Sequence, residues 1–241
     1  MEFKSKAVDQ EGLDILDVVS KAKKLNNWMY QTIEPYCKGA TLEIGSGIGN
    51  ISEFFVTNKY DISVSDLREN YRTILKDKFN LPENKVLDLD IVDPDFDTKS
   101  KNLLNTFDSV FSLNVVEHIK DDHLAIKNMV KLLKPGGNLV ILVPAYQALY
   151  NNFDTTLEHY RRYNKKSLTT LMGNYGEIIS AFYFNAVGTL GWWVSGKLFK
   201  NKMIPEGEMK LYNTLVPIIK IVDKVTFNKV GLSVICVITK K

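Results

Sequence analysis

The stretch TLEIGSGIG at residues 41–49 decides the fold, because it joins a β-rich apolar run to a turn with three glycines. Leu42 and Ile44 are typical of a buried strand in the centre of a sheet. Glycine tolerates positive φ and, without a Cβ atom, lets the backbone approach a ligand closely. A helix expected at Ile51–Phe55 follows, and free N–H groups at its start favour a ligand. The stretch predicts a strand, a ligand-binding turn and a helix, although packing alone also explains such glycines.

Short β-rich runs alternate with helical patterns on both sides of this turn. Such alternation predicts an α/β domain with a mostly parallel sheet that is covered by helices on both faces. Apolar residues at helical spacing predict one or two helices over residues 13–37 and another at Lys166–Tyr175. The strands expected after the first are DISVSD at 61–66, Val86–Ile91, FDSVFSLN at 107–114, GNLVILVP at 137–144, EIISAFYFN at 177–185 and a last run within 231–241.

The composition is that of an ordinary globular protein, with 45% hydrophobic and 24% charged residues and a formal net charge of +3. Basic residues form no stripe, so we expect no nucleic acid partner. Cys37 and Cys236 lack the spacing of a zinc site or a redox pair, and we predict no metal. The N-terminus has no apolar export signal, and no apolar stretch reaches the ~20 residues of a membrane span. We therefore expect a soluble, cytoplasmic protein.

Two carboxylates near the glycine turn indicate the kind of ligand. Asp66 closes the second expected strand, where a carboxylate reaches ribose hydroxyls. Glu43 precedes the first glycine and would repel a pyrophosphate, and Asn50 stands where the dinucleotide fingerprint has a small residue. These features favour an adenosine that carries an ammonium or sulfonium group. A nicotinamide-dependent oxidoreductase is the less favoured alternative.

The run EIGSGIG at 43–49, followed by VSD at 64–66, resembles the first motifs of class I S-adenosylmethionine-dependent methyltransferases. The likeness extends to Val86–Ile91, FDSVFSLNVVEHIKD at 107–121 and LLKPGGNLVILVP at 132–144. It implies a seven-stranded Rossmann-like sheet in the order 3-2-1-4-5-7-6, with the last strand antiparallel, and S-adenosyl-L-methionine as the cofactor. The cofactor-binding residues that it implies are Glu43, Gly45, Ser46, Gly47, Gly49, Asp66, Leu67, Asp90, Ile91, Asn114 and Val115.

Within this set, the third-strand motif places Asp90 against the adenine amine and Ile91 against the ring. Other acids follow in the same run, so Asp90 has the alternative of solvating a loop. Asn114 and Val115 are expected to contact the methionine part of the cofactor.

The resemblance implies one methyltransferase domain over 1–241. It comprises N-terminal helices at 1–38, a cofactor-binding core at 39–144 and an acceptor-binding half at 145–241, which contains a helical insert at 186–230. The whole protein is expected to be a monomer or a homodimer.

The insert at 186–230 is the expected source of acceptor specificity. Its aromatic residues and its apolar stripe over Leu211–Val225 either line an acceptor pocket or lie on a membrane surface, with nearby lysines facing head groups. The alternative is that the stripe packs on the core or on a second subunit. The residues concerned are Trp192, Trp193 and Phe199, and the lysines are Lys197, Lys200 and Lys202.

Methyl transfer from a sulfonium is an in-line displacement, so positioning of the acceptor supplies much of the rate. His118, in VVEHI, is the first candidate general base, because an imidazole accepts a hydroxyl proton near neutral pH. Small-molecule O-methyltransferases, including those of quinone biosynthesis, have a similar Glu-His pair, and we place the chain near that subgroup. A purely structural role for His118 is equally compatible with the sequence, and Glu117 is expected to be structural.

The segment EHYRRYN at 158–164 is the second unusual cluster. His159 and Tyr163 are reserve candidates for acid–base catalysis. Arg161 and Arg162 either grip an anionic group of the acceptor or pair with acids of the protein itself. Together these features predict methylation, most simply at oxygen, of a small hydrophobic or lipid- or glycan-linked acceptor. A catalytically silent protein that binds S-adenosylmethionine is the main alternative.

Overall fold

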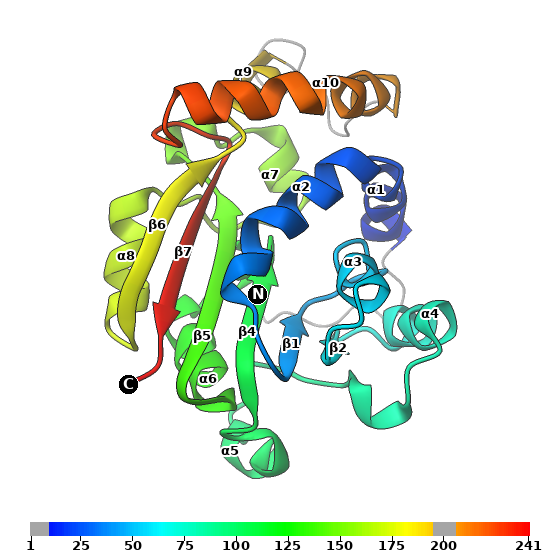
Figure 1. The fold of residues 1–241 in the computed structure, drawn as a ribbon, viewed down its shortest axis with the longest axis vertical. Coiled ribbons are helices and arrows are strands. Elements are labelled where there is room, and N and C mark those ends of the chain that lie inside the picture. The colour runs from blue at the N-terminus through cyan, green and yellow to red at the C-terminus, as the bar shows by residue number, and fades with distance from the viewer. Residues whose placement is uncertain (1–9, 195–205) are drawn as a thin grey trace.

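The centre of the protein is a twisted sheet with helices on both faces (Figure 1). The computed structural model describes residues 10–194 and 206–241. The strands in these ranges are β1 (Thr41–Ile44), β2 (Ile62–Ser65), β3 (Val86–Leu87), β4 (Phe107–Leu113), β5 (Leu133–Pro144), β6 (Glu177–Phe184) and β7 (Ser233–Thr239).

These seven strands form one sheet in the order β3-β2-β1-β4-β5-β7-β6. Strands β1 to β5 are parallel, and β7 runs antiparallel to both of its neighbours, β5 and β6. The order and the antiparallel last strand confirm the predicted Rossmann-like sheet. Because parallel strands end at the same edge, the glycine turn after β1 and the segments after β2, β4 and β5 meet there.

Helices precede the sheet, connect its strands and cross its upper edge in Figure 1. No helix of the described ranges is long and apolar enough to cross a membrane. The α-helices are α1 (Gln10–Ser20), α2 (Lys23–Ile33), α3 (Ser52–Thr57), α4 (Glu69–Phe79), α5 (Phe96–Lys99), α6 (Asp122–Leu132), α7 (Asn152–Thr156), α8 (Lys165–Gly173), α9 (Ala186–Trp193) and α10 (Glu206–Val225).

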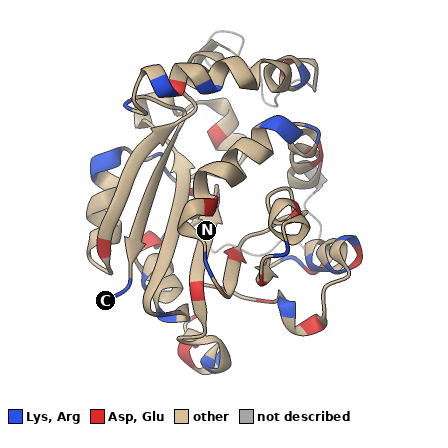
Figure 2. Ribbon diagram, in the orientation of Figure 1, with Lys and Arg blue, Asp and Glu red and all other residues tan. Residues whose placement is uncertain are grey.

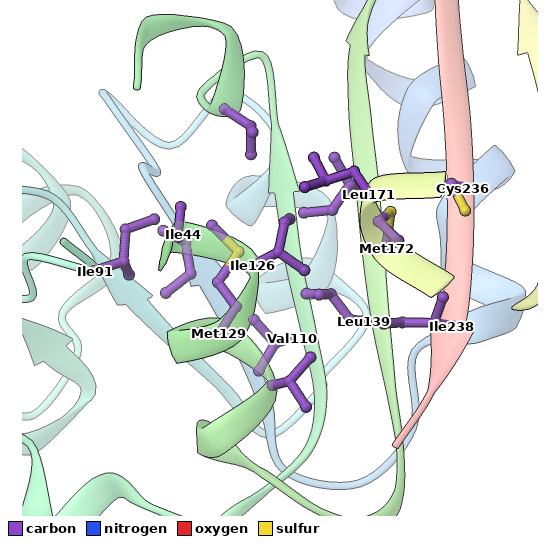
Figure 3. Packing of buried hydrophobic residues seen from close by; sticks show 14 of the residues in the cluster. Ile44, Ile91, Val110, Ile126, Met129, Leu139, Leu171, Met172, Cys236 and Ile238 are labelled. Carbon is purple, nitrogen blue, oxygen red and sulfur yellow. The ribbon is translucent and has the colours of Figure 1, made fainter. Parts of the chain in front are cut away.

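Both faces of the sheet are buried, as the continuous apolar runs of the strands predict. Alternate residues of β5 illustrate this: Val140 and Leu142 pack with α2 and α3, whereas Leu139 and Ile141 pack with α6 and α8. Figure 3 shows the apolar residues on the α6 side of the sheet, where side chains of α6 lie against those of β1, β4 and β5. Most Lys, Arg, Asp and Glu residues lie on helices and loops (Figure 2), and a few lie in strands, among them Glu43 in β1 and Asp108 in β4.

Two boundaries differ from the sequence-based expectation. The third strand was expected over Val86–Ile91 but ends at Leu87. As an edge strand, β3 pairs with β2 alone, and this pairing covers two residues. In addition, the fifth strand was expected over 137–144 but begins at Leu133, so Pro135 and Gly136 lie inside β5, where the register with β4 shifts.

The described part of segment 186–230 contains the helices α9 and α10, as predicted, and both lie beyond the upper ends of β4 and β5 in Figure 1. The predicted roles of Lys197, Phe199, Lys200 and Lys202 fall outside the described residues.

The aromatic contact between Phe111 of β4 and Phe55 of α3 offers a test of the core. Phe111 is fully buried, and its ring centroid lies 4.9 Å from that of Phe55. We predict that Phe111→Ala lowers the free energy of unfolding by about 3–5 kcal/mol, because it leaves a cavity. Phe227→Ala is the matched control at a side chain that is 79% exposed, and its cost should stay within about 0.5 kcal/mol. Urea unfolding measures both, and equal losses would contradict this packing.

Candidate functional site

The turn after β1 is a strand-to-helix bend of nearly bare backbone. Gly45, Gly47 and Gly49 have φ values of +72°, +54° and +78°, in the left-handed region that favours glycine. A Cβ atom on Gly45 would lie 2.5 Å from a methyl group of Val115, and one on Gly47 would lie 3.0 Å from Leu16 of α1. The turn is therefore enclosed by the segment after β4 on one side and by α1 on the other.

Asp66 joins this turn to the end of β2. Its carboxylate accepts hydrogen bonds from the backbone N–H groups of Gly47 and Arg68, both at 3.0 Å. Burial raises the pKa of Asp66, and these two hydrogen bonds oppose the shift. Each carboxylate oxygen has a second lone pair, so the group can still accept hydrogen bonds from a ligand's hydroxyls. Ser46 strengthens the same junction, because its N–H donates to the Ser65 carbonyl at 2.8 Å.

Glu43 lies in β1, directly before the turn, and is almost completely buried. Burial raises its pKa to about 7, although hydrogen bonds from the hydroxyls of Ser52 and Ser46 lower it. Its carboxyl group is thus partly charged at neutral pH. Its negative charge lies beside the glycine turn, where it attracts a cationic group of a ligand and repels a pyrophosphate.

The residues predicted to hold an adenine occupy different environments. Leu67 follows Asp66 and is 38% exposed. Asp90 is half-buried three residues beyond the end of β3, and its carboxylate accepts a hydrogen bond of 2.9 Å from the Val92 N–H. The Ile91 side chain is buried among Ile44 and the residues of α6, as Figure 3 shows. The adenine contacts of Asp90 and Ile91 stay predictions.

The structure brings Asn114 and Val115, at the end of β4, to the glycine turn. Val115 supplies the methyl group that faces Gly45. Asn114 is exposed and has a φ of +55°, a left-handed conformation that asparagine adopts more readily than most residues. Its N–H donates to the Leu142 carbonyl of β5 at 2.8 Å, which fixes the loop at the edge of the sheet.

Two histidines from distant segments meet beside this loop. His118 ends the short 3-10 helix η4 (Val116–His118), and His159 follows α7; their ring centroids are 4.6 Å apart. Nδ1 of His159 lies 2.8 Å from a carboxylate oxygen of Asp154. The same oxygen accepts a hydrogen bond of 2.7 Å from Nε of Arg162. Glu117 adjoins the pair and is fully buried.

The environment of this cluster changes the properties of its ionisable groups. Removal from water, followed by the nearby His159, lowers the pKa of His118 to about 3. The His118 ring is therefore neutral at physiological pH and is a weak base, because an effective general base has a pKa near the working pH. Burial raises the pKa of Glu117 to about 8.

Tyr163 and the two arginines are committed to partners within the protein. The Tyr163 hydroxyl donates to Asp122 at 2.7 Å, and Arg161 forms an ion pair of 2.6 Å with the same carboxylate. Arg162 is buried between Asp154 and the ring of Trp192, whose centroid lies 4.6 Å from the guanidinium carbon. Of the two alternatives for these arginines, the structure shows pairing with acids of the protein.

Asp154 and Glu117 are the members of the cluster that sequence reasoning does not select. The signal for Asp154 is its position three residues after Asn151, since the two residues form a capping box at the start of α7. For Glu117 the sequence offers only its place beside His118, and it gives no measure of the complete burial of the side chain.

Comparisons with known proteins show the family to which this fold belongs. A family model described as a methyltransferase domain matches residues 22–177. Phosphoethanolamine N-methyltransferase 1 of Triticum aestivum is 29% identical over 102 residues, which are 42% of this chain and 20% of that protein. The chain thus spans about a fifth of the length of the curated relative that it matches.

Solved structures share the fold at low sequence identity. A SAM-dependent methyltransferase from Archaeoglobus fulgidus has a TM-score of 0.57 and 17% identity, over 89% of this chain and 94% of that one. Phosphoethanolamine N-methyltransferase 2 from Haemonchus contortus, in complex with S-adenosyl-L-methionine, has a TM-score of 0.55 and 18% identity, over 90% and 52%. With the family model matching more than half of its length, the chain belongs to the methyltransferase domain family.

Proposed function

We propose that this methyltransferase acts on an oxygen of a hydrophobic, lipid- or glycan-linked acceptor that it meets at a membrane surface. The observation that carries the proposal is an apolar outer face on α10, the helix that lies across the carboxyl edge of the sheet. The same proposal, on the same observation, includes membership of the quinone-biosynthesis subgroup of methyltransferases.

The residues around the glycine turn fit the cofactor. The turn at Gly45 and Gly47 lets a ligand approach the backbone closely. The Asp66 carboxylate can accept hydrogen bonds from ribose hydroxyls. The charged form of Glu43 attracts a cation. When bound, S-adenosylmethionine supplies a methyl group on a cationic sulfur, which is ready for displacement by the acceptor. The protein's task is then to orient the acceptor and to exclude water.

Helix α10 has apolar residues on two sides. Val216 and Ile219 are buried against the core, with 2% and 3% exposure. The outer face of α10 points to solvent, and its side chains are 40% to 69% exposed. A helix that only packs on the core keeps a polar outer side, so this face is suited to an apolar partner. The outer face consists of Leu211, Leu215, Ile218, Ile221 and Val225.

The charges around the outer face suit an anionic lipid surface. Lys210 and Lys224 of α10 and Lys229 in the following turn are exposed. Asp223 is buried instead and accepts hydrogen bonds from the N–H groups of Asn185 and Ala186 at the start of α9. An apolar face with lysines beside it is the pattern of helices that lie in the plane of a membrane interface. This pattern favours a bilayer over a second copy of the chain as the occupant.

Proton removal from the acceptor is the least defined step. His118, His159 and Tyr163 stay predictions as acid–base groups. His118 is a weak base because of its lowered pKa, and the Tyr163 hydroxyl already donates to Asp122. Positioning of the acceptor against the methyl group is therefore proposed as the main source of rate.

Methylation of an amine is the second candidate. The name of the wheat relative, a phosphoethanolamine N-methyltransferase, favours a small phosphorylated amine as the acceptor. Radiolabelled S-adenosylmethionine, offered in parallel with a lipid extract, small phenols and phosphoethanolamine, separates the two. Label transferred to lipid or phenol supports the first proposal, and label transferred only to phosphoethanolamine replaces it with the second.

Substitution at the glycine turn tests the cofactor site. We predict that Gly47→Arg reduces the affinity for S-adenosylhomocysteine at least about 100-fold, because a side chain fills the close approach to the backbone. Gly136→Arg is the matched control. Gly136 also has a positive φ, at +77°, but a Cβ atom there would have no neighbour within 4 Å. Isothermal titration calorimetry measures both affinities, and equal binding by the two variants would overturn the assignment.

The raised pKa of Glu43 predicts how binding depends on pH. A carboxyl group with a pKa of about 7 gains charge as the pH rises from about 6 to about 8. The affinity for S-adenosylmethionine should therefore increase over this interval, because the charged form attracts the cation. In the Glu43→Gln variant this rise in affinity should be smaller. Any ionisation of the cofactor itself affects both proteins equally, so it cancels when the two are compared. If the affinity rises equally with pH in both proteins, Glu43 does not contribute to cofactor binding.

The membrane proposal is tested at the centre of the outer face. We predict that Ile218→Glu lowers binding to vesicles of phosphatidylcholine and phosphatidylserine about 10-fold or more, since a buried charge in the interface is costly. Ile179→Glu on β6 is the control, because Ile179 is 48% exposed but lies on the edge strand. Vesicle co-sedimentation measures both. Unchanged sedimentation of the Ile218 variant, or dimer dissociation as its only effect, would contradict a membrane role.

A further inference from the structure

A cluster of three potential metal ligands lies at the carboxyl edge of the sheet, beside the glycine turn. Glu117 and His118 come from η4, and His159 comes from the segment after α7. One ligand atom from each residue lies within 4.8 Å of the other two. We propose that Glu117, His118 and His159 bind one divalent transition-metal ion, such as Zn²⁺. This site goes beyond the methyl-transfer function and does not depend on the identity of the acceptor.

The first reason is the state of the Glu117 carboxylate. It is fully buried, and no residue of the described ranges hydrogen bonds to either of its oxygens. A buried carboxylate without a partner is strongly unfavourable, and natural proteins pair such groups or use them to coordinate metals. The backbone at this point is fixed, because the Glu117 carbonyl accepts a hydrogen bond of 2.8 Å from the Tyr160 N–H.

The second reason is the support behind each histidine. Nδ1 of His159 lies 2.8 Å from Asp154, which leaves Nε2 directed to Glu117, 4.0 Å from its Oε1. The backbone of Leu157 lies beside the His118 ring, and one nitrogen of that ring is a ligand atom of the cluster. Histidine ligands characteristically donate one ring N–H to a carboxylate or a carbonyl while the second nitrogen binds the metal.

The third reason is the balance of charge. Arg162 contacts the Asp154 carboxylate and neutralises it through the 2.7 Å ion pair. The Glu117 carboxylate is then the one acid of the cluster, in the described residues, that accepts no hydrogen bond from a cationic side chain. A divalent cation would give this carboxylate a partner of opposite charge.

The ligand set indicates the class of ion. Two imidazoles and one carboxylate with further positions open are typical of catalytic zinc and of non-haem iron sites. With bonds of about 2.0–2.2 Å, tetrahedral ligand atoms lie about 3.3–3.6 Å apart. Side-chain rotations would therefore have to close separations that are at most 4.8 Å in this structure. The open positions would face the edge at which the acceptor meets the cofactor.

Zinc titration tests the site directly. Protein freed of metal by chelation is titrated with ZnCl₂ by calorimetry, and we expect one ion per chain. Glu117→Gln and His159→Ala should each weaken binding at least about 100-fold, because loss of supporting residues alone costs about 10- to 100-fold. The control is His123→Ala, since His123 is on α6 and contacts Tyr175. That variant should bind zinc as the wild type does.

Two further measurements guard against unfolded variants. Thermal unfolding and S-adenosylhomocysteine binding show whether each variant keeps its fold, and zinc X-ray absorption of the wild-type protein shows its ligands. Two imidazoles in the absorption spectrum confirm the site. The proposal is overturned by a spectrum without imidazole, by zinc binding that survives Glu117→Gln, by binding lost in His123→Ala, or by no binding at all. Loss of cofactor binding with zinc binding retained would count against the methyltransferase site alone.

Discussion

The hydrogen bond from the Gly47 N–H to the Asp66 carboxylate is the contact on which the site depends. It joins the turn after β1 to the end of β2, so two neighbouring parallel strands end in one rigid junction. This contact requires a left-handed backbone at Gly47 and close approach of Val115 to Gly45, and both conditions demand glycine. The candidate cofactor site is therefore a consequence of backbone geometry more than of side-chain chemistry.

The same edge of the sheet holds the second group of functional residues. The Asn114 N–H ties the end of β4 to β5, and from that loop η4 places Glu117 and His118 against His159. Asp154, Arg162 and Trp192 then link this cluster to α7 and α9. Helix α9 packs in turn with α10, so the apolar outer face is connected to the residues nearest the expected methyl group. An acceptor drawn from a membrane would arrive beside this cluster.

Most of the fold could be predicted because its determinants are local. Short β-rich apolar runs predicted β1, β2, β4, β5, β6 and β7, and the glycine pattern predicted the turn after β1. The third strand was predicted too long, since pairing with β2 ends at Leu87 and sequence shows no such limit. Tyr163 was selected for its chemistry, but its hydroxyl turns to Asp122 on α6, a contact between segments far apart in the chain.

The sequence by itself determined the class of fold and the positions of the glycine turn and Asp66, because periodicity and the need for positive φ act over a few residues. The cofactor was implied by the resemblance of the motifs to a known family. Only the tertiary structure decided that His118 and His159 face each other beside a buried Glu117, and that the Leu211–Val225 stripe looks outward except at Val216 and Ile219. The physical reason is that helical periodicity specifies which residues share a face. Which face is covered, and which loops meet at the edge of the sheet, depends on packing between distant segments.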